Sequence, residues 1–299
     1  MVGKIQQINL LRSFRQHHYF ARLQVNYQQM IYLLIFIAVV AIILIIGKIK
    51  LFFQFDREVR QLFAQSKVMS NKTFSYEQLI GLPEPVQRYF KYVLKDNQPY
   101  INYLRLTHTG KFKSGLEKDW TNIQGEEYFT TEKPGFLWKG KTSMFTARDM
   151  YIADSGRLVV SLFSLFNIVN VQGEQYNQGE LLRWLAESVW FPTNFLPSEN
   201  LHWTAIDSQS VKLTFDYKGL SLFFIVRFNN IGAITEMESK RYMDEKHLET
   251  WICLMADYQE RTGMMIPIKA EVLWRLEKGD FSYGKFNVQT IEYEKPEKF

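Results

Sequence analysis

The sequence of 299 residues is poor in the groups that most directly reveal an activity. It contains one cysteine, Cys253, which excludes an intrachain disulfide and a metal site built from cysteines alone. It has no G-x-S-x-G nucleophile turn, no P-loop and no dinucleotide-binding G-x-G-x-x-G. We therefore assign no catalytic residue and no cofactor from the sequence.

Histidine is also scarce and scattered. Two of the five histidines precede the long apolar run described below, and the other three are isolated from one another: His17, His18, His108, His202 and His247. Neither H-x-x-x-H nor H-E-x-x-H spacing occurs, so no metal site is predicted. Cys253 lies in the apolar stretch "WICLMA" and is expected to be a small buried hydrophobic residue.

A large excess of charge of one sign is missing too. The chain has 36 Lys and Arg against 31 Asp and Glu, a formal net charge of +5, so we expect no nucleic-acid partner. Hydrophobic residues make up 46% of the chain and aromatic residues 16%. That composition suffices for a large core and excludes a wholly disordered chain.

What the sequence does have is one long uncharged run, "MIYLLIFIAVVAIILIIG", from Met30 to Gly47. A helix rises about 1.5 Å per residue, so this run nearly spans a hydrocarbon core of roughly 30 Å. No small-x-small cleavage site follows the run, which argues against a cleaved signal peptide. We predict a transmembrane helix over 30–47, preceded by a basic tail over 1–29.

The expected orientation rests on the basic residues that flank this run. The tail has no acidic residue and four basic ones, which favours a cytoplasmic N-terminus: Lys4, Arg12, Arg15 and Arg22. Basic residues also follow the run, but large domains translocate largely regardless of charge. We expect a single-pass membrane protein whose C-terminal domain is extracytoplasmic.

Residues 48–72 are predicted to form a helical stalk or linker. Within them, the stretch Lys50–Lys67 has apolar residues at spacings of three and four, typical of one helix face: Phe52, Phe55, Val59, Leu62 and Phe63. Two interpretations stay open. The segment lies on the membrane surface as an amphipathic helix, or it packs on the globular domain.

The remaining residues, 73–299, are expected to form one mainly β domain. Helices are predicted near 75–95, where Ser75 and Gln78 have the spacing of a capping box, and near 176–190. Elsewhere apolar and polar residues alternate, as in "INYLRLTHTGKF" and "VKLTFDY", which is typical of half-buried strands.

Short turns between the alternating stretches force antiparallel hairpins. The predicted fold class is therefore α+β and mainly β: a curved antiparallel sheet or incomplete β-barrel of about 9–11 strands with a few packing helices. The concave face of such a sheet is either filled by side chains or encloses a cavity. Both alternatives stay open.

The stretch "GELLRWLAE" provides the candidate charge cluster: Glu180, Arg183 and Glu187, which share one helix face. One interpretation is a carboxylate pair at a cleft, with Arg183 holding a substrate anion. The other is a structural Arg–Glu pair that fixes the helix beside the sheet. Among other acids, Asp149 and Asp154 are expected near strand ends.

Several phrases, in their order and spacing, resemble a bacterial family of unknown function. They are "LPEPVQRYF" (82–90), "RWLAE" (183–187), "WFPTNFLP" (190–197) and "IPIKAEVLW" (266–274), within a match of roughly 74–293. The resemblance implies no known activity, so it supplies no catalytic residue. The expected architecture is also distantly similar to the half-barrels of periplasmic lipoprotein carriers, and architecture alone does not establish function.

Three functions remain open for this chain. The first is a membrane-anchored module that binds a lipid or another apolar ligand in a β half-barrel. The second is a structural or protein-interaction domain at the membrane, and the third is an enzyme acting on an envelope or membrane-associated substrate. The sequence does not indicate the ligand or the oligomeric state.

Overall fold

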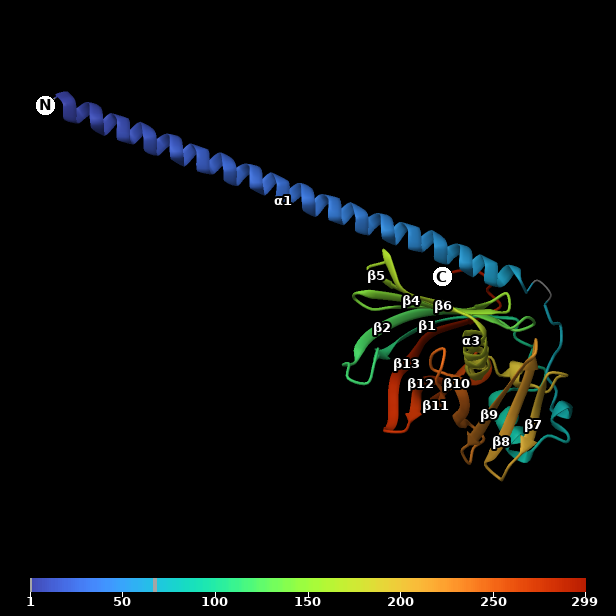
Figure 1. Cartoon of the computed structure of the whole chain (residues 1–299). Coiled ribbons are helices and arrows are strands. Elements are labelled where there is room, and N and C mark those ends of the chain that lie inside the picture. The colour runs from blue at the N-terminus through green and yellow to red at the C-terminus, as the bar shows by residue number, and fades with distance from the viewer. Residues whose placement is uncertain (1, 67–68) are drawn as a thin grey trace. The chain divides into compact units, whose positions relative to one another are not determined.

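The computed structural model describes the backbone of residues 2–66 and 69–299 and the side chains of residues 27–66 and 69–299. The basic residues of the tail, His17 and His18 therefore lie outside the described side chains. The chain divides into two compact units, residues 1–51 and 52–299. Helix α1 (Val2–Ala64) belongs to both units (Figure 1).

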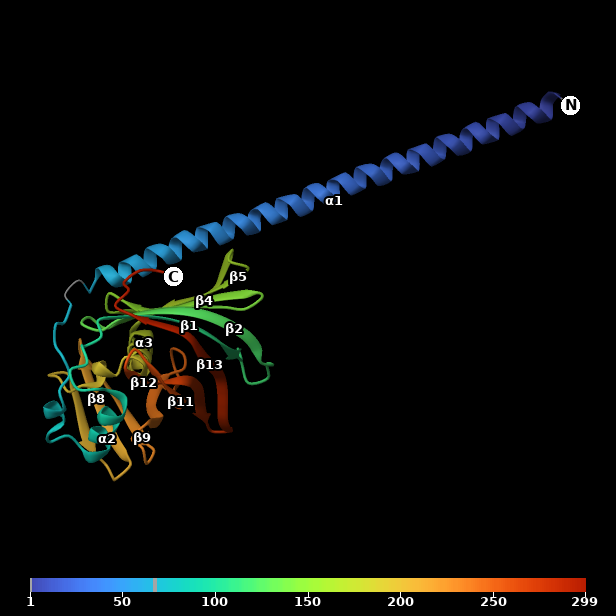
Figure 2. The ribbon, with the colours of Figure 1, turned by 180° about the vertical axis from the view of Figure 1, so that it is seen from behind.

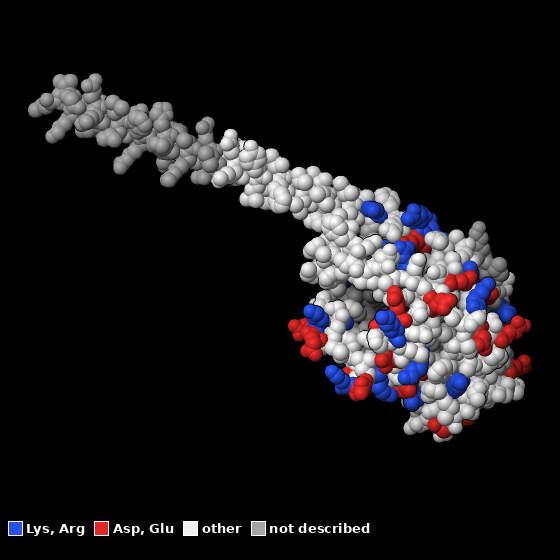
Figure 3. All heavy atoms as spheres, in the orientation of Figure 1, with Lys and Arg blue, Asp and Glu red and all other residues white. Residues whose placement is uncertain are grey.

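The first unit contains the long uncharged part of α1. Its helix from Tyr27 onward is long and apolar enough to cross a membrane, with a mean hydropathy of 3.2 in its most apolar window. Figure 3 shows a long stretch of this helix without charged side chains. Only 6% of that window is buried, unlike a core helix, although length and composition also fit a signal sequence.

The second unit contains a 13-stranded antiparallel sheet. Its first six strands are β1 (Tyr103–Phe112), β2 (Thr121–Thr130), β3 (Gly135–Lys141), β4 (Phe145–Ile152), β5 (Ser155–Leu162) and β6 (Phe166–Gln172). The others are β7 (Leu201–Ala205), β8 (Ser210–Tyr217), β9 (Leu220–Phe228), β10 (Ile234–Tyr242), β11 (Leu248–Arg261), β12 (Met264–Leu276) and β13 (Gly279–Tyr293).

The predicted fold class is confirmed, with more strands than expected. The sheet is curved, antiparallel and open, as Figures 1 and 2 show. The expected nine to eleven strands were too few. The short edge strands β6 ("FNIVNVQ") and β7 ("LHWTA") have too little regular alternation to be recognised from sequence.

The order of the strands explains how the sheet is built. Strands β1 to β6 form one meander and β7 to β13 another, and β1 pairs with β13 to join them at the centre. The two edges of the sheet, β6 and β7, are therefore consecutive along the chain. The segment between them must cross from one edge to the other.

That crossing segment consists of α3 (Glu174–Glu187) and two short 3-10 helices, η2 (Ser188–Trp190) and η3 (Pro192–Phe195). Helix α3 packs against β3 to β6 on one side and against β9 and β10 on the other. Gly156 in β5 permits this close approach, since a Cβ there would lie 2.2 Å from the carbonyl oxygen of Tyr176. Gln178 bonds the backbone of β10 through both ends of its amide.

A second group of helices covers one end of the sheet. The predicted capping box is present: Ser75 and Gln78 cap η1 (Tyr76–Leu79). Helix α2 (Glu84–Val93) follows, and packs against β12 and β8 (Figure 2). Tyr92 of α2 contacts Tyr258 near the β11–β12 turn, with 5.7 Å between ring centroids.

The convex face of the sheet is covered by the last part of α1. Of the five apolar residues that define one helix face in Lys50–Lys67, Phe52 is exposed. The other four are buried against the sheet: Phe55, Val59, Leu62 and Phe63. They pack with residues of β1 to β4 in one cluster: Tyr103, Tyr128, Leu137, Met150 and Ile152. Residues 52–64 are thus part of the globular unit, as the second interpretation of Lys50–Lys67 required.

Candidate functional site

A row of side chains crosses the concave face from β1 to β5. Register places Leu106, Glu127, Trp138, Asp149 and Leu158 opposite one another in successive strands. Side chains directly opposite in paired strands share one face of a sheet. The row therefore presents two carboxylates, both buried, to the helix that crosses this face.

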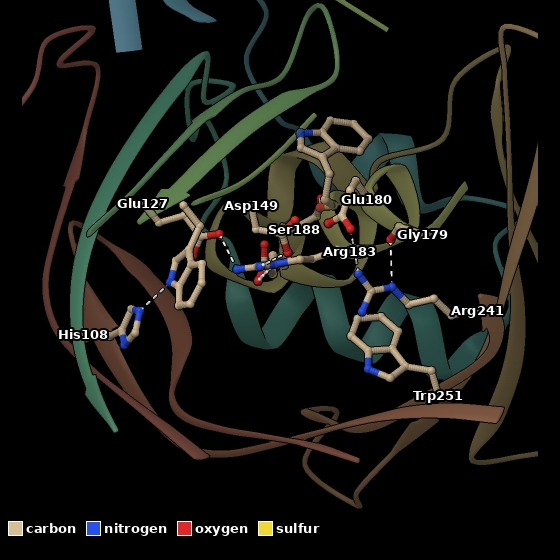
Figure 4. Close-up of polar contacts among 12 residues, drawn as sticks. His108, Glu127, Asp149, Gly179, Glu180, Arg183, Ser188, Arg241 and Trp251 are labelled. Carbon is tan, nitrogen blue, oxygen red and sulfur yellow. Dashed lines mark hydrogen bonds and ion pairs between the residues drawn. The ribbon is translucent and has the colours of Figure 1, made fainter. Parts of the chain in front are cut away.

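Helix α3 places Arg183 against these carboxylates. Its guanidinium donates through Nη2 to Glu127 Oε1 at 2.8 Å and through Nη1 to Asp149 Oδ2 at 2.7 Å. It also donates through Nε to Glu187 Oε1 at 2.8 Å, one turn along the helix. Figure 4 shows Arg183 pointing from α3 toward the strands.

Glu180 does not bond to Arg183. Its Oε1 accepts a hydrogen bond from Nη2 of Arg241 in β10 at 3.2 Å, and Arg241 also donates through Nε to the carbonyl of Gly179 at 3.0 Å. Arg241 reaches α3 from the side opposite to Glu127 (Figure 4). The expected helix face is thus divided, since Arg183 and Glu187 pair while Glu180 belongs to a second arginine.

Aromatic rings pack against both guanidinium groups. Arg183 lies over Phe136 and Trp138, at 4.9 and 5.1 Å from the ring centroids. Arg241 lies over Trp251 at 4.6 Å and near Trp274 at 5.9 Å. Such contacts stabilise a desolvated cation.

These rings belong to a larger set that we call the aromatic band. It consists of two groups of rings on the concave face, and within each group neighbouring ring centroids lie 5.0 to 6.5 Å apart. Its members are Phe112, His108, Trp138, Phe224, Trp251, Trp274, Phe281, Tyr283 and Phe286. Phe112, Tyr283 and Phe286 are only half-buried.

The cluster contains four carboxyl groups for two guanidinium groups. Burial raises the pKa of Glu127 and of Glu180 well above the usual 4.5, and nearby carboxylates, Glu187 and Asp149 respectively, raise them further. Burial also raises the pKa of Glu187. Protonated Glu127 and Glu180 would leave two carboxylates, which the two arginines neutralise.

Unpaired oxygens in the cluster agree with such shared protons. Asp149 Oδ1, Glu180 Oε2 and Glu187 Oε2 are buried and accept no hydrogen bond from the described residues. A protonated Glu180 has a proton to share with Asp149, and a protonated Glu127 has one to share with Glu187. These two pairs agree with the carboxylates that raise each pKa: Glu187 raises that of Glu127, and Asp149 raises that of Glu180.

His108 lies beside this cluster and is held neutral. Its Nε2 accepts a hydrogen bond from Nε1 of Trp138 at 2.7 Å. Burial, and then the charge of Arg183, lower the pKa of His108 to about 4. Gly125 makes room for the imidazole, since a Cβ there would lie 2.2 Å from Nε2.

The described residues contain no group of three or more His, Cys, Asp or Glu positioned to hold a metal ion. In this site the carboxylates instead surround arginines. Cys253 is buried, and burial raises the pKa of its thiol well above the usual value. Through these ion pairs Arg183 of α3 contacts β2 and β4, and Glu180 of α3 contacts β10.

Sequence reasoning missed three members of the cluster: Glu127, Asp149 and Arg241. Asp149 was expected near a strand end, which is wrong, because it lies in the middle of β4. One available signal was alternation, since Glu127 shares its strand phase with the apolar Phe129. Glu126, the neighbour of Glu127 in β2, lies on the opposite face of the sheet, where it bonds Lys139 and Tyr128.

Comparison with solved structures gives distant likenesses in fold, two of which are described here. A LolA superfamily protein from Nitrosomonas europaea is 9% identical, with a TM-score of 0.41, over 71% of this chain and 92% of that chain. A putative outer membrane lipoprotein-sorting protein domain from Vibrio parahaemolyticus is 10% identical, with a TM-score of 0.38, over 64% and 86%. These likenesses are too distant to indicate a ligand.

Sequence comparison gives a firmer result. No curated protein matches the chain. The model of a family of unknown function, DUF6544, matches residues 72–286, which is most of the globular unit. The chain therefore belongs to this family of unknown function, as its motifs indicated.

Proposed function

We propose that this protein is a membrane-anchored module that binds a lipid or another apolar ligand against the aromatic band. The observation that supports this most is the band itself. Rings from six strands lie on the concave face in two groups of neighbouring rings, and three of them are only half-buried. A binding surface for an apolar ligand is typically built from such side chains.

The two ends of the sheet differ in a way that supports entry from one side. Antiparallel pairing places the β1–β2, β3–β4 and β5–β6 turns at the same end, which we call the rim. Exposed apolar side chains occur on all three turns, among them Leu116, Met144 and Phe163. The other end is covered by α2 and η1. An apolar ligand would enter at the rim.

We propose that the charge cluster positions α3 and does no chemistry. The side chains of Arg183 and Glu187 are 15% and 16% exposed, and that of Glu180 is 5% exposed. Each guanidinium is already bonded to carboxylates, so neither is free to hold a substrate anion. Glu180, Arg183 and Glu187 therefore have a positioning role in this proposal.

We propose that the run 30–47 anchors the protein in the membrane, with the globular unit on the extracytoplasmic side. Its support is the uncharged, exposed and apolar surface of α1 from Met30 to Gly47. Only residues 48–51 separate this run from the globular unit, which begins at Phe52. Such a short connection would hold the unit close to the bilayer.

Native mass spectrometry with lipid extraction tests the binding proposal. The fragment should comprise 52–299, because a start near Asn71 would remove Phe55, Val59 and Leu62 from the convex face. We expect a reproducible lipid or other apolar molecule, and a lower occupancy in Phe112→Ser, which removes a half-buried ring of the band. Ile80→Ser, an exposed position outside the band, is the matched control.

An empty fragment, or equal occupancy in Phe112→Ser and the wild type, would count against binding at the band. The proposed orientation has its own test. A membrane-impermeant maleimide should label Glu132→Cys in intact cells, because this residue is exposed at the end of the sheet opposite the rim. Labelling only after lysis would place the domain inside the cell.

A further inference from the structure

Two neighbouring turns at the rim expose more large apolar side chains than the surrounding surface does. They are the β3–β4 turn and the β5–β6 turn with the start of β6. We call their five exposed residues the apolar tips: Met144 (48% exposed), Phe145 (38%), Phe163 (46%), Phe166 (65%) and Ile168 (54%). Large apolar side chains exposed together on adjoining turns are typical of an interaction site.

The tips are held together by local hydrogen bonds. Phe163 donates its backbone N–H to the carbonyl of Met144 at 2.9 Å, which joins the two turns. The hydroxyl of Thr142 accepts from the backbone of Met144 at 3.3 Å and of Phe145 at 3.0 Å. The exposed side chains are therefore presented by ordered turns.

The β5–β6 turn contains a phenylalanine that its backbone disfavours. Phe163 and Ser164 have φ of 50° and 63°, values that a two-residue hairpin turn needs and that glycine and asparagine adopt most readily. The β4–β5 turn has nearly the same geometry, φ 53° and 63°, and uses Ala153 and Asp154. A bulky exposed ring at Phe163 is thus not explained by the turn, which suggests a role at the surface.

The charges around the tips suit an anionic, apolar surface. Residues 158–173 contain no charged residue, and residues 140–147 contain Lys141 and no acid. Strand β6 is an edge strand, yet it has neither charge nor proline, the usual protection of a free edge. Something other than water is therefore expected to cover this region.

We propose that the apolar tips insert into the surface of the bilayer that holds the protein. This inference rests on the proposed membrane anchor, which would keep the globular unit within reach of the lipid. Side chains on turn tips can enter the headgroup region, whereas pairing of β6 with a second copy would leave Met144 and Phe163 uncovered. Lys141 beside the tips favours anionic lipid.

The test uses the full chain in nanodiscs of phosphatidylcholine with about 30% phosphatidylglycerol, an anionic lipid. An environment-sensitive fluorophore is attached to Ser143→Cys, which keeps all five tip residues, or to Glu132→Cys, an exposed residue on the opposite end of β3. A third label at Val39→Cys reports on the apolar run itself. Cys253 is buried, so the unsubstituted chain serves as the labelling blank.

We expect lipid-attached quenchers to reduce the fluorescence at Ser143→Cys roughly twofold or more relative to Glu132→Cys, because only the former lies at the membrane. Phe163→Ser with Phe166→Ser and Ile168→Ser should abolish this difference. The matched control changes three exposed apolar residues elsewhere to serine: Ile80, Ile206 and Ile231. It should leave the difference unchanged.

The three labels separate failure of this inference from failure of the anchor. Quenching at Val39→Cys without quenching at Ser143→Cys would leave the anchor standing and overturn insertion of the tips. No quenching at Val39→Cys would overturn the anchor. Protection of Ser143→Cys that depends on protein concentration and comes with crosslinks between copies would assign the tips to self-association, which also overturns the inference.

Discussion

The two faces of the sheet each bury arginine against carboxylate, but in different proportions. On the convex face, Arg148 of β4 bonds one carboxylate, Glu58 of α1, and both side chains are almost fully buried. On the concave face, Arg183 and Arg241 share four carboxyl groups. The convex pair has one positive and one negative charge. The concave cluster has two more carboxyl groups than arginines, so bound protons are needed to neutralise it.

Arginine–carboxylate contacts therefore affect stability differently on the two faces of the sheet. A balanced buried pair is costly only when one partner is removed. A cluster with excess acid also depends on pH, because burial raises the pKa of Glu127 and Glu180. The position of α3 is therefore expected to respond to both mutation and pH.

The largest expected effect is that of Arg183→Ala, which strands Glu127, Asp149 and Glu187 on the concave face. We expect the free energy of unfolding to fall by about 3–5 kcal/mol, because uncompensated buried carboxylates remain. Thermal and urea denaturation of the 52–299 fragment measure this. Arg275→Ala is the control: its side chain is 50% exposed, and the loss there should stay below about 1 kcal/mol. An unchanged melting curve for Arg183→Ala would contradict the buried cluster.

A somewhat smaller loss is expected on the convex face. Arg148→Met leaves one unpaired carboxylate, that of Glu58, and should cost about 3 kcal/mol. Adding Glu58→Leu should restore most of that stability, since a well-packed apolar pair replaces a buried ion pair at little net cost. If the double variant is no more stable than Arg148→Met, the unpaired carboxylate of Glu58 is not the cause of the lost stability.

The stability of the concave cluster is also expected to depend on pH. In the unfolded chain, Glu127 and Glu180 release their protons near pH 4.5, whereas the folded cluster retains them to higher pH. Stability from these groups is therefore complete below about pH 4.5 and decreases as pH rises through their raised pKa values. His108 acts oppositely, because acidification from pH 6.5 toward 4 favours the unfolded chain. Chemical denaturation from pH 5 to pH 9, compared with Glu127→Gln, would reveal this slope.

The smallest effect is expected for Glu180→Gln. An amide resembles a protonated carboxyl group in shape and hydrogen bonding, so the change should cost less than about 1 kcal/mol near neutral pH. It should also flatten the decrease in stability at alkaline pH. Glu58→Gln, at the balanced convex contact, should cost more than Glu180→Gln. Equal losses would show that the cluster does not retain a proton at Glu180.

Features that depend on residues close together in the chain could be predicted from the sequence. Alternation revealed the long strands, and short turns required antiparallel pairing, so the fold class could be predicted. The Arg183–Glu187 contact lies one helical turn apart and was also accessible. Glu127, Asp149 and Arg241 come from distant strands, and only the curvature of the sheet and the path of α3 bring them together.

The packing of 52–64 shows the same limit. One amphipathic stripe suits a membrane surface and a protein surface equally well. The deciding partner, Arg148, lies 90 residues away and belongs to a strand that is buried on both faces. Such a strand has no clear alternation, so its charged residues give little sign of where they point.

The pairing of β1 with β13 has a consequence for how the domain forms during synthesis. Gln289 bonds Thr109 across this pair, 180 residues apart in the chain. The first meander therefore emerges from the ribosome with β1 as an open edge and with no crossing helix against its inner face. It must wait for nearly the whole chain before the central ladder closes, which favours slow folding and a need for protection until the last strand arrives.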